Sequence, residues 1–212
     1  MSNYLITSTE EDIEGISRCH LQCFKNSLSS KLGIAYTKKT FEWFLNNDHR
    51  FLFHITIDGE VAGYCGGFIP RYIGDGSTSN IMQYTIRQAF IGIIFHPWLI
   101  FQKDVIGLYP LIFRNVKKKI FKRGRSSVAL QPVTAIDKRV GLVVIGVHPQ
   151  HRGSGLFQRL MHEFEAKALL HQIHKLVLSV KKDNVRAIKA YTKQGWFIIK
   201  EHAQTLEMIK YI

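Results

Sequence analysis

The sequence predicts an α/β protein in which a central mixed β-sheet is flanked by helices. Short apolar runs typical of strands alternate along the chain with amphipathic segments typical of helices. The order is clearest after residue 140, where strand, glycine-rich turn, helix, strand, helix and two closing strands follow one another. A composition of 46% hydrophobic and 21% charged residues is that of a globular protein. We therefore expect one domain over residues 1–212, with an insertion at about residues 70–138.

The first fifty residues predict a strand and two helices. Residues 4–7 are a strand candidate, and Ser8 or Thr9 is placed to cap the helix that follows. The apolar stripe of that helix consists of Ile13, Ile16, Cys19, His20 and Cys23. We expect both cysteines to pack in the core. A second helix is expected at residues 37–47, after a polar stretch.

Residues 51–57 and 61–69 predict two strands that form a hairpin. The dipeptide between them, Asp58-Gly59, favours a two-residue type I′ turn. The second strand also contains three glycines, which weaken it and permit another element to approach closely. These are Gly63, Gly66 and Gly67. Two interpretations remain open, a bulge packed against a neighbouring helix and the lining of a substrate groove.

The insertion carries most of the positive charge of the chain. Between residues 71 and 139 there are twelve Lys and Arg against three Asp, a net +9 of the formal +13. Helices are expected at residues 81–95 and 110–121, with a break at His96-Pro97. The basic cluster at the end of the second helix has an ordinary interpretation as a solvated helix end. It also has the composition that attracts anions.

The C-terminal third predicts a buried strand at Val140–Val147, a helix ending near His171 and a strand at residues 174–181. The apolar stripe of the helix consists of Leu156, Phe157, Leu160, Met161, Phe164 and Ala168. A short helix then starts at Asp183 or Asn184 and is stopped by Gly195. Closing strands are expected at residues 196–200 and 205–211.

The turn between Val147 and Phe157 has the build of an anion cradle. An apolar strand runs into a turn that opens through Gly153 and Gly155 into a helix. Glycine lets the backbone approach a ligand closely, and the unpaired amide groups at a helix start carry about half a positive charge. The turn is therefore expected to hold a diphosphate without a metal ion.

Two linked motifs in this region resemble the GNAT acetyltransferase superfamily. The first is Arg152-Gly-Ser-Gly-Leu-Phe157, which resembles the R/Q-x-x-G-x-G/A motif of that family. The second is N-x-x-A-x-x-x-Y followed by G-W, which runs from Asn184 through Tyr191 to Trp196. Together they cover residues 140–197. The resemblance implies the GNAT fold, with a long helical insertion between the third and fourth strands. Phe157 departs from the family pattern, because glycine or alanine is usual there; its side chain either narrows the cradle or points into the core.

The resemblance also implies acetyl-CoA as the acyl donor and a place for each part of it. Backbone groups of Ile145 and Val147 would bind the pantetheine arm, and Asn184 would contact it from the next helix. The diphosphate would be held by the amide groups of Arg152, Gly153, Ser154, Gly155, Leu156 and Phe157.

Tyr191 is the candidate catalytic residue. The resemblance places it near the sulfur, where a phenol with a pKa of about 10 can hydrogen-bond to a leaving thiolate or protonate it. The alternative for Tyr191 is an aromatic residue packed in the core. Asn184 and Tyr191 are seven residues apart, about two helical turns, and so share a face.

No general base is assigned. An alkylammonium has a pKa of about 10.4, so an amine acceptor must lose a proton before it attacks. Many members of the family carry a glutamate on the fourth strand, but residues 140–147 contain no carboxylate. Asp137 and His148 are the nearest titratable groups, and His148 has the simpler interpretation of a solvent-facing turn residue. The sequence has no metal-ligand spacing, so no metal site is expected.

These observations predict an acetyl-CoA-dependent N-acetyltransferase acting on a primary amine of a small acceptor. The basic insertion favours an acceptor with a phosphate, such as a nucleotide-linked amino sugar. The alternative is a membrane-surface or partner-binding protein that uses the basic, apolar insertion as its interaction element. Nucleic acid is not an expected partner, because the basic cluster lacks interleaved aromatic residues. Three cysteines without paired spacing, and no basic and apolar leader in residues 1–9, predict a cytoplasmic protein.

Overall fold

A computed structural model describes residues 4–71, 77–101 and 138–212. These residues contain one mixed sheet in the order β1-β2-β3-β4-β5-β7-β6. Neighbouring strands are antiparallel except for β4 and β5, which are parallel. The strands are β1 (Tyr4–Thr7), β2 (Arg50–Ile57), β3 (Glu60–Phe68), β4 (Val140–Val147), β5 (Lys175–Lys181), β6 (Phe197–Glu201) and β7 (Thr205–Tyr211). The predicted mixed sheet is confirmed.

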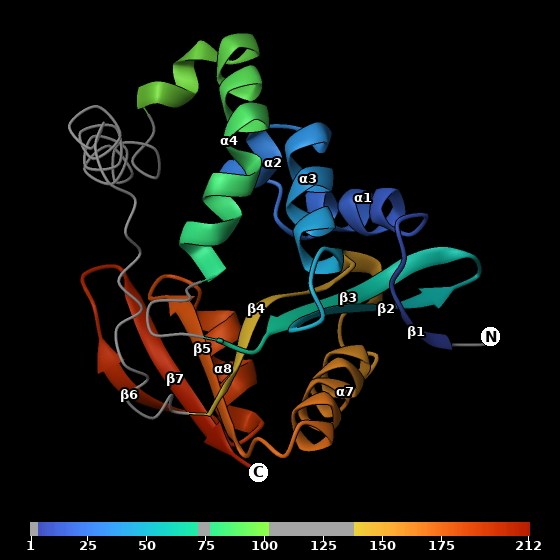
Figure 1. Cartoon of the computed structure of the whole chain (residues 1–212), viewed down its shortest axis with the longest axis vertical. Helices are drawn as coiled ribbons and strands as arrows, with labels where there is room; N and C mark the ends of the chain where they lie inside the picture. The colour runs from blue at the N-terminus through green and yellow to red at the C-terminus, as the bar shows by residue number, and fades with distance from the viewer. Residues whose placement is uncertain (1–3, 72–76, 102–137) are drawn as a thin grey trace.

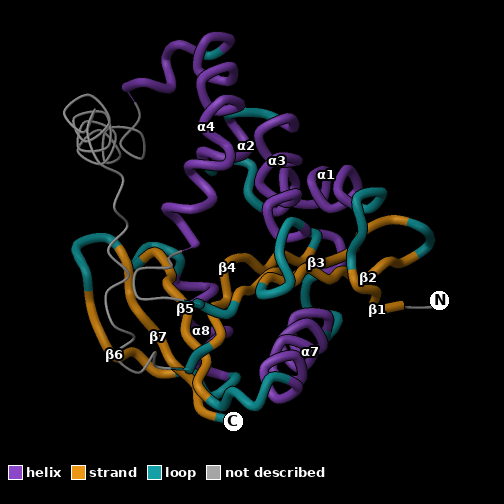
Figure 2. The backbone as a smooth tube through the Cα atoms, viewed as in Figure 1, coloured by secondary structure: helices purple, strands orange, loops and turns teal. Residues whose placement is uncertain are grey.

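Helices cover both faces of this sheet (Figure 1). On one face α1 (Ile13–Cys23) and α3 (Ile34–Leu45) pack on β2 and β3, joined by the short α2 (Leu28–Lys31). On the other face lies α7 (Leu156–Leu170), which packs on β3 and β4. The helix α8 (Val185–Lys193) shares a core cluster with α7. The helices and strands thus form the layers seen in Figure 2.

The N-terminal helices differ in detail from the prediction. The helix α1 begins at Ile13 and not directly after Thr9, because the Asp12 carboxylate accepts hydrogen bonds from the Thr9 amide and hydroxyl at 2.8 and 3.0 Å. The helix α3 begins at Ile34, three residues earlier than predicted. Thr37 lies inside it and donates its hydroxyl to the Gly33 carbonyl at 3.1 Å. A threonine satisfied in this way does not act as a cap.

The polar stretch before α3 also contains structure that the sequence analysis missed. Ser27 caps α2, since its hydroxyl accepts the Ser30 amide at 3.2 Å. A helix of four residues has no apolar periodicity to reveal it.

The hairpin at Asp58-Gly59 is confirmed, with φ values of 52° and 83° at the two turn residues. The glycines of β3 serve close packing. A Cβ on Gly66 would come within 2.7 Å of Phe44 on α3, and one on Gly67 would come within 2.7 Å of Phe164 on α7. The first interpretation, packing against helices, is therefore the correct one for these two positions.

A bulge in β4 positions the functional site. Gly66 pairs with Val144 and Gly67 with Leu142, so Val143 is an extra residue in β4. A bulge of this kind bends the strand that carries it. The strands β4 and β5 pair only from Val140 to Leu142, and beyond that point they separate. The gap opens on the side of the sheet where β4 runs into the glycine-rich turn.

The insertion follows β3, as predicted. Its described part consists of α4 (Ser77–Phe95), which packs on α3, and the 3-10 helix η1 (Pro97–Phe101). The helix starts four residues before the predicted position, because Ser, Thr and Asn are accepted in a first helical turn. The break at His96-Pro97 is confirmed, since proline has no amide hydrogen to donate. The second predicted helix, at residues 110–121, lies outside the described residues. Within the described ranges, none of the helices has the length and apolar character needed to cross a bilayer.

Candidate active site

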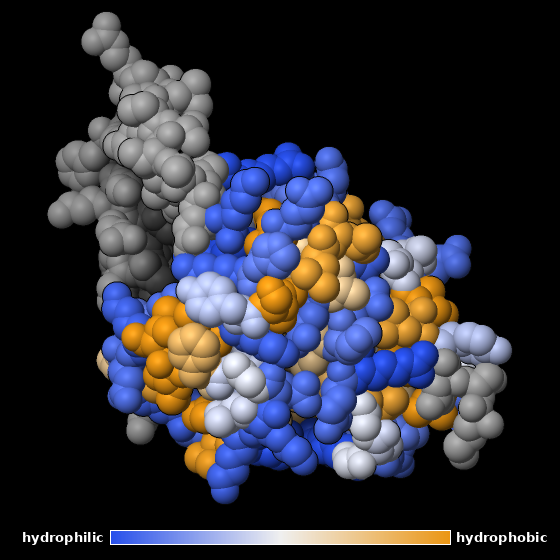
Figure 3. All heavy atoms as spheres, turned by 90° about the horizontal axis from the view of Figure 1, so that it is seen from below, coloured by the Kyte–Doolittle hydropathy of each residue, from blue (hydrophilic) through white to orange (hydrophobic). Residues whose placement is uncertain are grey.

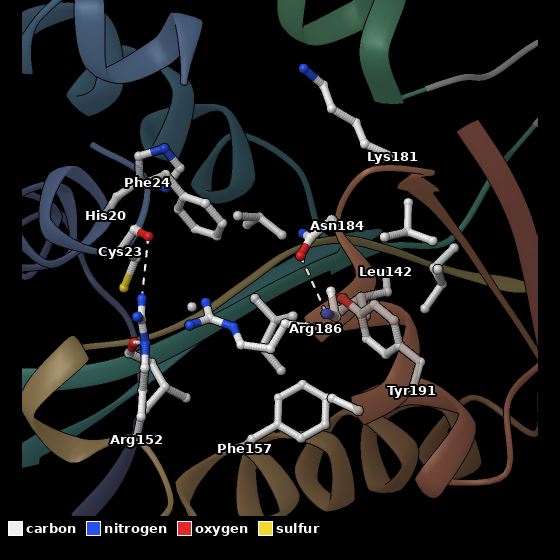
Figure 4. A pocket seen from close by; sticks show the side chains of 18 of the residues that line it. His20, Cys23, Phe24, Leu142, Arg152, Phe157, Lys181, Asn184, Arg186 and Tyr191 are labelled. Atoms are coloured by element: carbon white, nitrogen blue, oxygen red, sulfur yellow. Dashed lines mark hydrogen bonds between the residues drawn. The ribbon is translucent and has the colours of Figure 1, made fainter. Parts of the chain in front are cut away.

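A cavity of about 600 Å³ lies where β4 and β5 separate (Figure 4). Its walls come from the second half of β4, the glycine-rich turn, the first turn of α7, the end of β5 and one face of α8. The C-terminal end of α1 completes it from the other face of the sheet. Residues far apart in the sequence thus meet at one opening in the sheet.

The glycine-rich turn is one end of this cavity. Gly153 and Gly155 both have left-handed backbone conformations, with φ values of 83° and 84°. A Cβ on either glycine would meet nothing within 4 Å, so the space in front of the turn is open. The first hydrogen bond of α7 runs from the Arg159 amide to the Gly155 carbonyl at 3.1 Å. The amides of Leu156, Phe157 and Gln158 therefore have no acceptor within the helix.

The free edge of β4 forms a side wall of the cavity. The amide of His148 donates to the Ala62 carbonyl of β3 at 2.8 Å. Backbone groups alternate in direction along a strand, so those of Ile145 and Val147 face away from β3 and toward the gap. The Val147 carbonyl is contacted there by Nε of Arg152 at 3.4 Å. The two residues predicted to bind the pantetheine arm therefore turn a strand edge without a neighbouring strand toward the cavity, where the Val147 carbonyl accepts the Arg152 bond.

Arg152 ties the turn to the opposite face of the sheet. Its Nη2 donates to the carbonyl of Cys23 at 3.3 Å, at the C-terminal end of α1 (Figure 4). The neighbouring Ser154 donates its hydroxyl to the His151 carbonyl at 2.6 Å. Ser154 thus stabilises the turn, while the exposed Arg152 guanidinium borders the cavity.

Asn184 and Tyr191 lie on the same face of α8 and both line the cavity. The Oδ1 atom of Asn184 caps the helix by accepting the Ala187 amide at 3.2 Å. Tyr191 is buried, and burial raises its pKa above the ordinary value for a phenol. Its ring lies between Phe157 at 5.8 Å and Trp196 at 6.0 Å. Within the described ranges its hydroxyl has no hydrogen-bond partner.

Phe157 has both features that the sequence left as alternatives. Its half-buried ring packs against Tyr191 and belongs to the edge of the main core cluster. The same ring lines the cavity (Figure 4). Its backbone amide remains in the first turn of α7. The Phe157 side chain therefore forms the part of the cavity wall next to Tyr191. It does not involve the backbone amides of the first turn of α7.

The α1 wall was not found from the sequence. It contributes His20, Cys23, Phe24 and Ser27. The prediction of a core position is right for Cys19, which is buried. It is right in part for Cys23, which is half-buried, packs against a core cluster and also lines the cavity. The apolar stripe was the only signal, and it does not separate core from cavity.

His20 is held in place by two hydrogen bonds. Nδ1 lies 2.6 Å from the Tyr64 hydroxyl and Nε2 lies 2.9 Å from the Ser29 hydroxyl. Burial lowers the pKa of His20 to about 4, so the ring is neutral near pH 7. Tyr64 in turn lies against β4, since a Cβ on Gly146 would come within 2.6 Å of its oxygen. A glycine at that position of β4 is required for this packing.

Cys23 has a perturbed thiol. Its sulfur lies 3.9 Å from that of Cys19, one helical turn away. The hydrogen bond from Cys19 lowers the pKa of the Cys23 thiol, and the positive charges of Arg152 and Arg186 lower it further. The same pairing raises the pKa of Cys19. The more reactive of the two sulfurs therefore faces the cavity.

The charged lining of the cavity is entirely basic among the described residues. It consists of Arg152, Lys181 and Arg186. No Asp or Glu from the described ranges lines it. His148, considered as a base from the sequence, is half-buried and does not line the cavity; its ring lies tilted to that of His151, with 6.0 Å between the ring centroids. Asp137 lies outside the described residues.

Comparison with known proteins relates part of the chain to one protein family. Residues 124–196 match the family model described as the acetyltransferase (GNAT) family. No curated protein sequence matches the chain.

Solved structures share the fold at low sequence identity. The ribosomal-protein-S18-alanine N-acetyltransferase from Escherichia coli is 13% identical, with a TM-score of 0.57, and the match covers 100% of this chain and 94% of that one. The PaiA N-acetyltransferase from Thermoplasma acidophilum, solved in complex with coenzyme A, is 10% identical over 100% of both chains, with a TM-score of 0.58. The NAA60 protein of Arabidopsis thaliana, in complex with acetyl-CoA, is 13% identical over 100% of this chain and 99% of that one, also at 0.58.

The chain therefore carries a GNAT acetyltransferase region at residues 124–196 and has the GNAT fold. The cavity at the separated strands contains the glycine-rich turn of this family match.

Proposed function

We propose that the protein is an acetyl-CoA-dependent N-acetyltransferase that acts on a primary amine of a small acceptor bearing an anionic group. The observation that supports this most strongly is the cavity between β4 and β5. It has open space in front of Gly153 and Gly155 and a buried phenol at Tyr191, whose hydroxyl has no hydrogen-bond partner among the described residues. We treat the chain as one domain with residues 70–138 as its insertion, because all described strands belong to one sheet.

The residues at the cavity fit acetyl-CoA, which supplies an acetyl group as a thioester when it is bound. The space before Gly153 and Gly155 is open, which supports a diphosphate there, bound by the amides of residues 152–157. Of these amides, that of Arg152 also donates to the Pro149 carbonyl at 3.4 Å. The arm would lie along the free edge of β4, where Ile145 and Val147 offer backbone groups. Asn184 would contact it from α8, through the side-chain nitrogen that does not take part in the cap.

Tyr191 is the proposed catalytic acid. Burial raises its pKa, so the hydroxyl keeps its proton at neutral pH and is a hydrogen-bond donor. A departing thiol has a pKa of about 8.5, which is lower than that of the phenol. Complete proton transfer to the thiolate is therefore uphill, and we assign Tyr191 the role of a donor that stabilises the developing negative charge.

The acceptor amine must lose its proton by another route. His20 is neutral and both of its nitrogens are engaged, so it can orient an acceptor but is a weak base for an ammonium group. No carboxylate of the described residues lines the cavity. We therefore propose that the proton passes to solvent and that the rate rises with pH toward the pKa of the free amine.

An anionic group on the acceptor is proposed from the charges of the cavity. Arg152, Lys181 and Arg186 line it, and no Asp or Glu of the described residues does. A polycationic amine would be repelled by this lining, whereas a phosphate or carboxylate on the acceptor would be attracted. The basic insertion adds positive charge on the chain segment that enters β4.

The experiment that tests the proposal has two steps. Isothermal calorimetry should first detect binding of acetyl-CoA to the full chain, and the absence of heat would overturn the donor assignment. Release of free CoA is then measured with matched pairs of amines, each with and without a phosphate. We expect the phosphorylated member of each pair to have the higher kcat/KM, and equal values would remove the anionic acceptor from the proposal.

The cysteines bear on the compartment of the protein. All three are free thiols, which supports a reducing, cytoplasmic compartment.

The second candidate function is attachment to a surface through the insertion. One observation favours it, the exposed apolar face of α4.

A further inference from the structure

The helix α4 has one packed face and one exposed face. On the packed side, Tyr84 accepts a hydrogen bond from Asn46 of α3 at 2.6 Å, and Thr85 is buried. Gly92 lies close to Leu32 at the C-terminal end of α2, and a Cβ on Gly92 would come within 2.8 Å of the Leu32 carbonyl. Leu99 of η1 is also buried. These contacts hold the helix in one orientation on the body of the protein.

The opposite face carries large apolar side chains in the solvent, which we name the α4 stripe. Spacings of three and four residues place them on one side of the helix. The stripe consists of Ile86, Phe90, Ile91, Ile94, Phe95 and Trp98. Ile94 is 74% exposed and Phe95 is 73% exposed, so they are almost as open as in an unfolded chain.

Exposed apolar side chains gathered on α4 and the adjoining η1 mark a surface suited to a partner of matching chemistry. Figure 3 shows the molecule from the α7 side, where each apolar cluster is bordered by hydrophilic residues. On the α4 stripe, in contrast, six large apolar residues follow one another over about three turns. None of the six lines the active-site cavity.

The charge composition of the chain favours an anionic partner. Residues 77–101 contain no Asp or Glu, and their one Lys or Arg is Arg87, which lies on the exposed face. In the sequence that continues directly from η1, residues 102–137 contain eight Lys and Arg against two Asp. A second copy of the chain would therefore bring like charges together, whereas an anionic phospholipid surface would neutralise them.

The side chains of the stripe also suit the interface of a bilayer. Aromatic and branched apolar residues insert between lipid head groups, and Trp is favoured at that depth. Trp98 stands at the end of the stripe, with its ring 5.1 Å from that of His96. In Figure 1 the C-terminal half of α4 and η1 project past α2 and α3, away from the sheet, so none of the other described elements lies beyond this end.

We propose that α4 and η1 form an interfacial docking element, and that the α4 stripe inserts into the head-group region of membranes rich in anionic phospholipid. The helix lies in the plane of the surface and does not cross it. The acyl-transfer site stays outside the lipid, because its cavity shares no residue with the stripe.

Vesicle sedimentation of the full chain tests this proposal. We expect the protein to sediment with vesicles of phosphatidylcholine and phosphatidylserine, less with phosphatidylcholine alone, and less again as salt is raised. The double variant Ile94→Ser/Phe95→Ser should weaken binding at least about tenfold, because it removes the two most exposed apolar side chains.

The matched control is Leu169→Ser/Leu170→Ser at the end of α7. Leu170 is 75% exposed, so the control removes a comparable apolar surface from another element. It should leave vesicle binding unchanged. Thermal unfolding of both variants separates loss of binding from loss of fold, and CoA release with a soluble amine should be unaffected by either. The proposal is overturned if the parent protein stays in the supernatant, or if both double variants bind equally. It is also overturned if ultracentrifugation shows a dimer that Ile94→Ser/Phe95→Ser dissolves, since the stripe would then bind a second copy.

Discussion

Tyr191 presents a protonated phenol to a cavity in which it has no described hydrogen-bond partner. Replacing it with phenylalanine keeps the ring between Phe157 and Trp196 and removes only the oxygen. We expect Tyr191→Phe to lower kcat by about 100-fold, with little change in the Kd of acetyl-CoA, since the lost hydrogen bond is strongest when negative charge develops. Steady-state kinetics and calorimetry measure the two quantities.

Tyr211→Phe is the matched control for this substitution, because Tyr211 is 60% exposed and lies outside the cavity. It should leave both constants unchanged. A Tyr191→Phe enzyme with the parent kcat would remove Tyr191 from catalysis and leave it as a packing residue.

Cys23 gives a chemical readout of the cavity. Its pKa is lowered by the hydrogen bond from Cys19 and by Arg152, whereas burial raises the pKa of Cys65 well above its ordinary value. Iodoacetamide should therefore modify Cys23 first and Cys65 last. Bound acetyl-CoA should slow modification of Cys23, because the thiol lines the cavity. Peptide mass spectrometry over time measures both effects, and equal rates at Cys23 and Cys65 would contradict the assignment.

At the scale of the element, the glycine-rich turn owes its shape to two left-handed residues. Gly59 in the β2–β3 hairpin has the same φ of 83° as Gly153 and equally open surroundings. Alanine at either position costs roughly 1–2 kcal/mol of backbone strain. We expect Gly153→Ala and Gly59→Ala to lower the melting temperature by similar amounts.

Only Gly153→Ala should weaken acetyl-CoA binding, by about tenfold in calorimetry, because its Cβ would enter the proposed diphosphate site. Because Gly59→Ala introduces the same backbone strain, a loss of affinity in Gly153→Ala alone cannot be due to that strain. Equal affinities in the two variants would show that the diphosphate does not lie before Gly153.

The whole molecule should lose stability in mild acid. Burial lowers the pKa of His20 to about 4 and also lowers that of His54, which bonds to Ser8 at 2.9 Å. The unfolded chain, with a histidine pKa of about 6.5, binds protons that the folded chain excludes. The stability from His20 is thus fully present above pH 6.5 and is lost as the pH falls toward 4, by up to about 3 kcal/mol.

Urea unfolding at a series of pH values checks this expectation. His20→Gln should flatten part of the acid loss, whereas His171→Gln, at an exposed position after α7, should not. A free energy of unfolding that does not change between pH 7 and pH 4.5 would contradict the neutral, buried state of His20.

Elements that depend on interactions between neighbouring residues in the chain could be predicted from the sequence. From Val140 to Tyr211 the predicted elements match the structure within one or two residues, because alternation, caps and glycine stops are local signals. The Asn184 cap and the turn at Asp58-Gly59 involve neighbours in the chain. The predicted starts of α1 and α3 were wrong. The apolar pattern does not specify the hydrogen bonds that Asp12 and Thr37 make at these ends.

What the sequence determined by itself is the order of helices and strands, the cradle at Gly153 and Gly155 and the shared face of Asn184 and Tyr191. What only the tertiary structure decided is the cavity that these residues line. Its opening depends on the bulge at Val143, and its second wall depends on Arg152 reaching the carbonyl of Cys23, 129 residues away in the sequence. Contacts between such distant residues arise only when the sheet brings them together, because no local pattern specifies which partner the fold will supply.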